Sequence, residues 1–400
     1  MATNNPYSNV NWDTIDRIQA VMHEHGGPDK VMEMYNRGFR NIAMSESQKF
    51  LPNDPAFPDD YYGSSPLYPL DRFIENPPPD LVGLPNTEIA SSIEGVGGHL
   101  ITLGSVGGWI GNNTEDFAGD NIANSIWHVA EEKRIIMPLY PDVFEHALDG
   151  IDDPNDSGTI GGLLYNDGGG LVMPHSSSWQ LIQSWLDAEP RFIGMANYNN
   201  FRMSDDRKFP SPGRGYYMKE WDLILSSGRR CWGFCESDRY DRGCNMLLLD
   251  IHTEETALQA YRNGTFYTKM DWDNNSLKFT KIIDHGNKIE VETEGAEKIF
   301  FITEKGMVKE ENGNIAEYQY PVSDGEVDLT FVRVEAHSSE FTDTEIAEED
   351  WPIPNYRDGV RYSDEIYSQP IYFRTKGEVD EIIRKRNLAR RKRYYLADLL

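Results

Sequence analysis

The histidines of this chain restrict its fold more than any other feature. Nine occur in 400 residues, and four of them lie in short segments punctuated by glycine or proline that are typical of strand ends. Glutamate and aspartate in similar segments extend this set. The six candidates are His23, His25, Glu88, His99, His175 and Asp238. Imidazole and carboxylate are natural ligands of zinc, manganese and iron. Residues so distant in sequence can form one metal site only if the fold brings many strand ends together.

The charge of the chain restricts its partners. Asp and Glu outnumber Lys and Arg by 66 to 38, which gives a formal net charge of −28. Such a surface repels nucleic acid and anionic membranes, so we expect neither as a partner. It also repels phosphate esters, so activity on an anionic ester would need metal ions to reverse the local charge. The chain shows neither an apolar run of membrane-spanning length nor a signal peptide, which predicts a cytoplasmic protein.

The last 25 residues and the cysteines form two local exceptions. Residues 376–400 contain eight basic and four acidic residues, which predicts a basic helical tail. This tail could dock on the acidic body of its own chain, or on an acidic partner in a homo-oligomer or larger assembly. Cys231, Cys235 and Cys244 are an odd number in a large chain, so we expect buried thiols rather than a disulfide framework.

Strand and helix patterns alternate over the first two thirds of the chain. Pro28 begins a helix that ends at Gly38, and the apolar run 39–44 follows as a strand. A similar pair is the strand 170–173 before the helix 179–186. After about residue 275 the pattern changes to alternating strands separated by turns. The sequence therefore predicts an α/β domain at 1–277, a small antiparallel β domain at 278–374, and the basic tail at 375–400.

Several of these segments, in this order, resemble one known family. They are His23-x-His25, the run Tyr35–Ser45, Pro85–Glu88, His99–Gly104, Met173–His175, Trp221–Asp238, Ala260–Tyr267 and Ser368–Tyr372. Together they are similar to the PHP family, the polymerase and histidinol phosphatase domain, over roughly residues 12–270 and into the β domain that follows. No single segment is specific, and the match depends on their order and spacing.

The resemblance implies a fold, a cofactor and an activity. The fold would be a distorted (β/α)7 TIM-like barrel with one to three divalent ions, Mn, Zn or Fe, at the C-terminal ends of its strands. His23, His25, Glu88, His99, His175 and Asp238 would be the metal ligands. The activity would be hydrolysis of a phosphoester, on a small molecule or a polymer, by water activated by the ions.

Three positions depart from the family pattern. Ser45-Glu46-Ser47 stands where the family has an aspartate–histidine pair, and Asp238-Arg239-Tyr240 where it has aspartate-x-histidine. Ala196 stands where a glutamate is usual. Glu46 and Tyr240 could compensate as catalytic groups, with Tyr240 donating a hydrogen bond to a bound oxyanion.

Two functions therefore remain open. One is a metal-dependent phosphoesterase. The other is a catalytically degenerate barrel that serves as a structural or binding subunit of a larger assembly, such as a phage virion, in which case the protein would be located in the virion.

Overall fold

The computed structural model describes most of the chain outside residues 105–168. The residues it describes are 2–45, 70–72, 74–84, 86, 88–91, 98–104, 169–173, 179–188, 192–199, 211–212, 215–237, 243–270, 276–323, 326–338, 340–342, 360–362 and 364–385.

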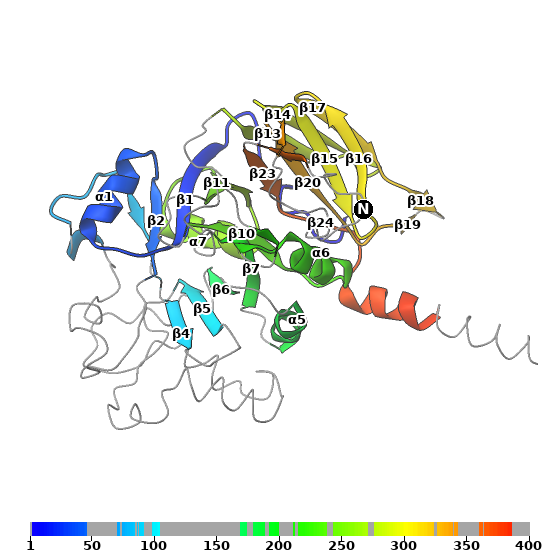
Figure 1. Cartoon of the computed structure of the whole chain (residues 1–400), viewed down its shortest axis with the longest axis horizontal. Coiled ribbons are helices and arrows are strands. Elements are labelled where there is room, and N and C mark those ends of the chain that lie inside the picture. The colour runs from blue at the N-terminus through cyan, green and yellow to red at the C-terminus, as the bar shows by residue number, and fades with distance from the viewer. Residues whose placement is uncertain are drawn as a thin grey trace, which may run out of the picture.

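A ten-stranded mixed sheet forms the largest element and runs across the upper part of the molecule in Figure 1. Its strands, in sheet order, are β16 (Gly306–Asn312), β15 (Lys298–Thr303), β20 (Phe331–His337), β23 (Glu365–Ser368), β12 (Phe266–Lys269), β11 (Cys244–Leu249), β1 (Asp16–Glu24), β2 (Asn41–Met44) and β3 (Val82–Gly83), with β24 (Ile371–Tyr372) paired to β20. The strands β1, β2 and β3 are parallel to one another. In the rest of the sheet, which runs from β1 through β11, β12, β23, β20 and β15 to β16, every neighbouring pair is antiparallel. One continuous sheet thus joins the strands of the 278–374 region to the N-terminal strands.

A second sheet has seven strands. They are β4 (Glu88–Ser91), β5 (Gly98–Leu103), β6 (Gly170–Met173), β7 (Phe192–Asn199), β9 (Gly215–Tyr216) and β8 (Ser211–Pro212), with β10 (Trp232–Glu236) paired to β7. β6, β7 and β10 are parallel to one another, whereas β4 and β5 form an antiparallel hairpin that precedes β6. The second sheet approaches the first where β10 contacts β1.

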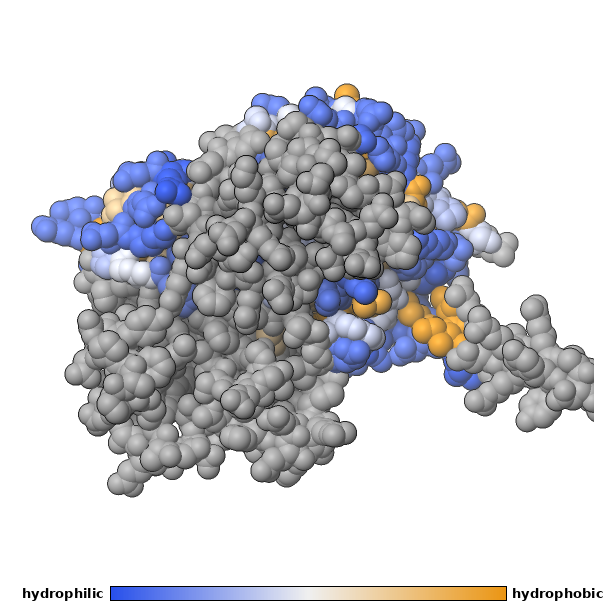
Figure 2. Space-filling model, in the orientation of Figure 1, coloured by the Kyte–Doolittle hydropathy of each residue, from blue (hydrophilic) through white to orange (hydrophobic). Residues whose placement is uncertain are grey.

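Three smaller sheets complete the strand inventory. They are β13 (Lys278–Asp284) with β14 (Lys288–Glu294) and β17 (Ile315–Gln319), β18 (Val322–Ser323) with β19 (Glu326–Val327), and β21 (Glu340–Thr342) with β22 (Val360–Tyr362). On the face shown in Figure 2, hydrophilic residues cover the region of β14 to β17. Cross-strand pairs account for part of this surface, because Lys281 lies 2.6 Å from Glu290 and Lys288 lies 2.6 Å from Glu317.

Helices are few in the described residues. They are α1 (Pro28–Asn36), α5 (Trp179–Ala188), α6 (Met218–Ser226), α7 (Glu254–Asn263), the 3-10 turn η2 (Leu70–Arg72) and the helical segment 376–385. The predicted helices after Pro28 and at 179–186 are confirmed, as are the strands at 39–44 and 170–173 within a few residues. None of the described helices is both long and apolar enough to cross a membrane.

The predicted (β/α)7 barrel is wrong, because the sheets stay open in the described residues. To close a barrel, β1 would have to pair with β10. Both edges of β1 are already used, one by parallel β2 and the other by antiparallel β11. The β4–β5 hairpin also interrupts the run of parallel strands between β3 and β6. The predicted mixture of α-helices and β-strands is confirmed, but the predicted closed topology is wrong.

The apolar core lies between the two large sheets and their helices. Its largest fully buried side chains include Trp221 of α6 and Trp232 of β10. A second apolar cluster fills the space between the 278–334 strands and the N-terminal segment. All three cysteines are buried free thiols, which confirms the expectation from their number. The boundaries at 277/278 and 374/375 stay a prediction.

Gly264 shows how tightly this core is packed. It ends α7 in the left-handed region, at a φ of 74°, and a Cβ there would lie 2.7 Å from ring atoms of Trp232. We expect Gly264→Ala to lower the free energy of unfolding by about 2–3 kcal/mol, from backbone strain and overpacking together. Urea denaturation measures this loss.

Gly286 provides the matched control for that substitution. It also has a positive φ, of 85°, but a Cβ there would meet nothing within 4 Å. Gly286→Ala should therefore cost only the backbone strain, about 1 kcal/mol. Equal losses at the two positions would contradict the packing argument.

Candidate functional site

Two histidines meet at the C-terminal end of β1. Because side chains alternate along a strand, His23 and His25 point to the same side, and Glu24 points to the other. The Nε2 atoms of His23 and His25 lie 3.2 Å apart, and the rings are tilted by 70°. His23 is fully buried, and His25 is partly exposed.

A carboxylate orients the first of these rings. Glu236, the last residue of β10, is fully buried, and its Oε2 lies 2.9 Å from His23 Nδ1. When Glu236 is ionised its oxygens only accept, so His23 Nδ1 is the donor in this contact. Asn199, the last residue of β7, also donates to Glu236 Oε2, at 3.0 Å. The Nε2 atom of His23 thereby faces Nε2 of His25, and one of these two nitrogens donates the hydrogen bond that joins the rings.

This arrangement has the form of a metal half-site. In metal centres a ligating histidine donates its other ring N–H to a carboxylate, which fixes the tautomer and the ring orientation. Two nitrogens bound to one tetrahedral zinc ion at about 2.05 Å would lie about 3.3 Å apart. The observed 3.2 Å between the Nε2 atoms of His23 and His25 fits that spacing.

A second buried carboxylate, that of Glu24, lies on the other side of the same strand end. Glu24 Oε1 accepts a hydrogen bond from the backbone N–H of His25 at 2.9 Å, and Ser237 Oγ donates to Oε2. Burial raises the pKa of the Glu24 carboxyl, although the hydrogen bonds from Ser237 and His25 oppose that rise. The register between β1 and β2 shifts at Val21–Glu24, so the regular strand pairing is interrupted next to the histidines.

Neutral polar groups close the ends of β2 and β3. Ser45 Oγ donates to the carbonyl oxygen of Met22 at 3.0 Å. The Asn86 amide donates to the same carbonyl at 2.7 Å and to Ser45 Oγ at 2.5 Å. Both side chains are buried. They tie the strand ends together and contribute no carboxylate or imidazole.

The predicted site residues are only partly placed. The structure brings His23 and His25 together. Glu88 and His99 lie in β4 and β5, where Glu88 pairs with Ile101 and His99 with Ala90, and their side chains are outside the described part of the structure. The metal candidates His175 and Asp238 and the catalytic candidates Glu46 and Tyr240 lie outside the described residues altogether. Within the described residues, no group of three His, Cys, Asp or Glu is arranged to hold a metal ion.

Sequence analysis missed two residues of this site. Glu236 and Asn199 are the last residues of the buried strands β10 and β7. Their signal was available, because each polar residue directly follows an apolar run, and the carboxyl ends of parallel strands are the usual place for ligands in α/β sheets. Asp238, two positions later, is an acidic residue in a similar sequence context, so the sequence alone does not favour Glu236 over it.

Comparison with known proteins leaves this geometry as the main guide to function. No protein-family model matches the chain, and no curated protein matches it either.

Proposed function

We propose that the protein is a divalent-metal-dependent hydrolase that cleaves a phosphoester. The observation that carries the proposal is the approach of His23 Nε2 to His25 Nε2, at 3.2 Å, with Glu236 on the opposite nitrogen of His23. The choice of a phosphoester, among the substrates of metal hydrolases, rests on the resemblance of the sequence to the PHP family.

The donor set suits a zinc, manganese or iron ion. Two imidazole nitrogens would bind it, and further ligands would come from elsewhere in the chain, with Asp238, His175, Glu88 and His99 as the sequence candidates. Such an ion polarises a phosphoryl oxygen and lowers the pKa of water, which are the two tasks of metal-assisted hydrolysis. It would also offset the negative charge of the chain for an anionic ester.

The chain's own groups have defined tasks in this proposal. Glu236 holds His23 in the tautomer that presents Nε2, and Asn199 holds Glu236. Burial of His23 and Glu236 excludes water from this pair. His25, which is partly exposed, lies on the side from which a substrate could approach.

The test is a measurement of bound metal and of phosphodiester hydrolysis on the full chain. We expect stoichiometric metal by elemental analysis, and turnover of bis(p-nitrophenyl) phosphate with added Mn²⁺ or Zn²⁺ that is lost after chelation. A protein that takes up neither ion and stays inert would refute the proposal.

Glu236→Gln separates ring orientation from folding. A glutamine can still accept from His23 Nδ1, so the fold should be retained, but the negative charge behind the ring is lost. We expect the affinity for Zn²⁺ or Mn²⁺ to fall about 10–100-fold, measured by isothermal titration calorimetry. The exposed pair His285–Glu290, at 3.1 Å, provides the control, because Glu290→Gln removes the same charge beside a histidine far along the chain and should leave metal affinity unchanged.

The second candidate function is a structural or binding subunit of a larger assembly. The hydrogen bonds of Ser45 and Asn86 favour it, because these side chains at the ends of β2 and β3 bind the backbone carbonyl of Met22 and supply no metal ligand there. In this case the histidine pair would bind metal weakly or for stability only. Metal uptake that raises the melting temperature without any hydrolysis would support this function over the first.

A further inference from the structure

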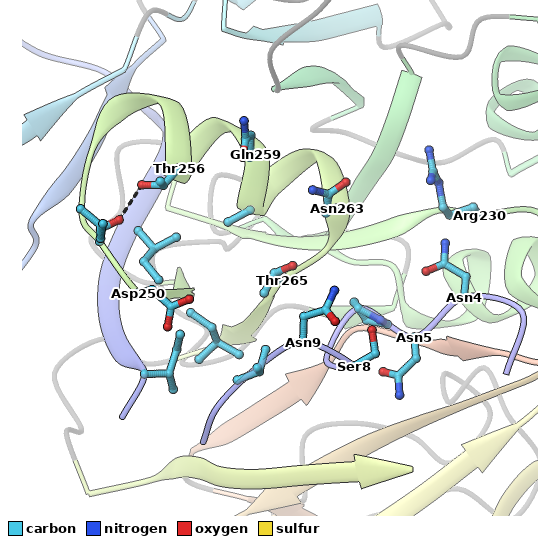
Figure 3. Close-up of a pocket in the computed structure, with 17 residues that line it drawn as sticks. Asn4, Asn5, Ser8, Asn9, Arg230, Asp250, Thr256, Gln259, Asn263 and Thr265 are labelled. Atoms are coloured by element: carbon cyan, nitrogen blue, oxygen red, sulfur yellow. Dashed lines mark hydrogen bonds between the residues drawn. The ribbon is translucent and has the colours of Figure 1, made fainter. Parts of the chain in front are cut away.

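A polar groove lies on the surface away from the histidine pair and has no role in the proposed function. Its volume is about 600 Å³, within the range of ligand sites. One wall is the N-terminal segment 4–10, and the other is α7 with the residues that flank it. Figure 3 shows Ser8 and Asn9 on the first wall and Thr256 and Asn263 on the second. We call this site the N-terminal groove.

The N-terminal wall is held firmly. Tyr7 is buried, its hydroxyl donates to the carbonyl of Phe266 at 2.9 Å, and it accepts from the backbone N–H of Gln369 at 2.6 Å. The backbone of Asn4 exchanges hydrogen bonds with Tyr372. The groove is therefore preformed between fixed elements, so little conformational entropy of the protein would be lost when a ligand binds.

The α7 wall is equally well defined. The side chain of Thr253 caps the N-terminus of the helix by accepting a hydrogen bond from the backbone N–H of Thr256, and Gly264 ends the helix in the left-handed conformation. Thr256, Gln259 and Asn263 follow one another at helical spacing along the groove. From Thr256 to Asn263 the helix rises by about 10 Å, the length of about three residues of extended chain.

The lining is amide-rich and poor in charge. Of its 17 residues only Arg230 and Asp250 are charged, in a chain where 26% of all residues are. In Figure 3 these two lie at opposite ends of the groove. Within the described part of the chain, the side-chain amides of Asn9 and Asn263 make no hydrogen bond, so both are available to a ligand.

The chemistry of the lining selects the ligand class. A side-chain amide both donates and accepts, so it matches the alternating N–H and C=O groups of a peptide backbone. Aliphatic residues such as Val10 and the exposed Ile251 would contact peptide side chains. None of the lining residues is aromatic, so the groove lacks the stacking surface that favours nucleobases.

We propose that the N-terminal groove binds an extended peptide segment, with about three residues along α7, an acidic group toward Arg230 and a basic group toward Asp250. The amides of Asn9 and Asn263 hydrogen-bond its backbone from the two walls. Backbone recognition of this kind tolerates different side chains, whereas the two terminal charges set the direction of the peptide.

The experiment is a subtractive selection. A library of random heptapeptides is enriched on the immobilised full chain and depleted on the double variant Asn9→Ala/Asn263→Ala. The strongest peptide is then synthesised and titrated by fluorescence anisotropy. We expect at least tenfold weaker binding to the double variant, since two hydrogen bonds are lost. N-methylation of its central backbone amides should abolish binding.

The matched control removes two exposed amides elsewhere. Asn287→Ala/Asn312→Ala changes exposed asparagines in the 278–374 region and should leave the affinity within twofold. Two results would overturn the proposal. One is a selection that yields no peptide dependent on Asn9 and Asn263. The other is a shift of the side-chain amide signals of these residues in NMR spectra with maltotriose or chitotriose but not with peptides.

Discussion

The double variant His23→Ala/His25→Ala is expected to lose stoichiometric metal and to reduce phosphodiester hydrolysis to background, at least 1,000-fold below the wild type as an order of magnitude. Both imidazoles supply donor nitrogens to the proposed ion, so neither can be replaced by water without loss of affinity. Elemental analysis and the bis(p-nitrophenyl) phosphate assay measure the two effects on the same preparation.

The single variants add a finer expectation. His25 is partly exposed and lies beyond the end of β1, so His25→Ala should fold like the wild type and lose metal alone. His23 is fully buried, and its removal leaves Glu236 without this partner, so His23→Ala should also lose stability. His285→Ala, at an exposed position, is the control for general histidine effects. Unchanged hydrolysis in His25→Ala would end the proposal that this pair binds a catalytic ion.

The second large effect concerns a buried arginine that joins α6 to the ten-stranded sheet. Arg333 of β20 is fully buried and makes a bidentate contact with Asp222 of α6, at 2.7 and 2.8 Å, and a third with Glu335. We expect Arg333→Ala to lower the free energy of unfolding by about 3–5 kcal/mol, because two buried carboxylates lose the positive charge of the arginine, while Glu335 keeps its contact with His337. Urea denaturation followed by circular dichroism measures the loss.

Arg229 provides the comparison for this variant. Its contact with Asp187 is also bidentate, at 2.9 and 2.7 Å, but Asp187 is exposed to solvent. Arg229→Ala should therefore cost at most about 1 kcal/mol. Arg333→Met, which keeps apolar volume beside Trp221, should resemble Arg333→Ala if charge rather than packing is decisive.

The loss of unfolding free energy caused by Arg333→Ala should also depend on pH. Burial raises the pKa of Asp222, and Arg333 opposes that rise. Without the arginine, the folded-state pKa of Asp222 should increase further above its unfolded value. A carboxyl whose pKa is higher in the folded than in the unfolded state lowers the free energy of unfolding once pH exceeds the unfolded-state pKa, and this loss disappears when the carboxyl is protonated. The difference in stability between variant and wild type should therefore shrink as pH falls from 8 toward 5, and a constant difference would contradict this account.

Local elements were predictable because their signals are local. Pro28 and Gly38 bracket α1, and the apolar run before residue 174 marks β6. The strands β14 and β15 follow directly from alternation and apolar runs at 288–292 and 298–302. Each of these signals spans only a few residues.

The closed barrel failed because strand partners are not local. The sequence patterns do not mark β11 as a partner of β1, yet it occupies the edge of β1 that a barrel would need, through pairs such as Ala20 with Asn245. Nothing within β1 distinguishes a partner 225 positions later from β10, which is closer in sequence. β11 in turn pairs with β12, which continues the sheet to β23.

In the candidate site, too, local sequence determined one part and the tertiary structure the other. The spacing of His23 and His25 alone determined that two imidazoles share one side of a strand end, because strand side chains alternate with a period of two. Only the tertiary structure decided that Glu236 contacts His23 there and that Asn199 holds Glu236. These residues come from strands of the other sheet, and their approach depends on the packing of β10 against β1, which no short stretch of sequence encodes.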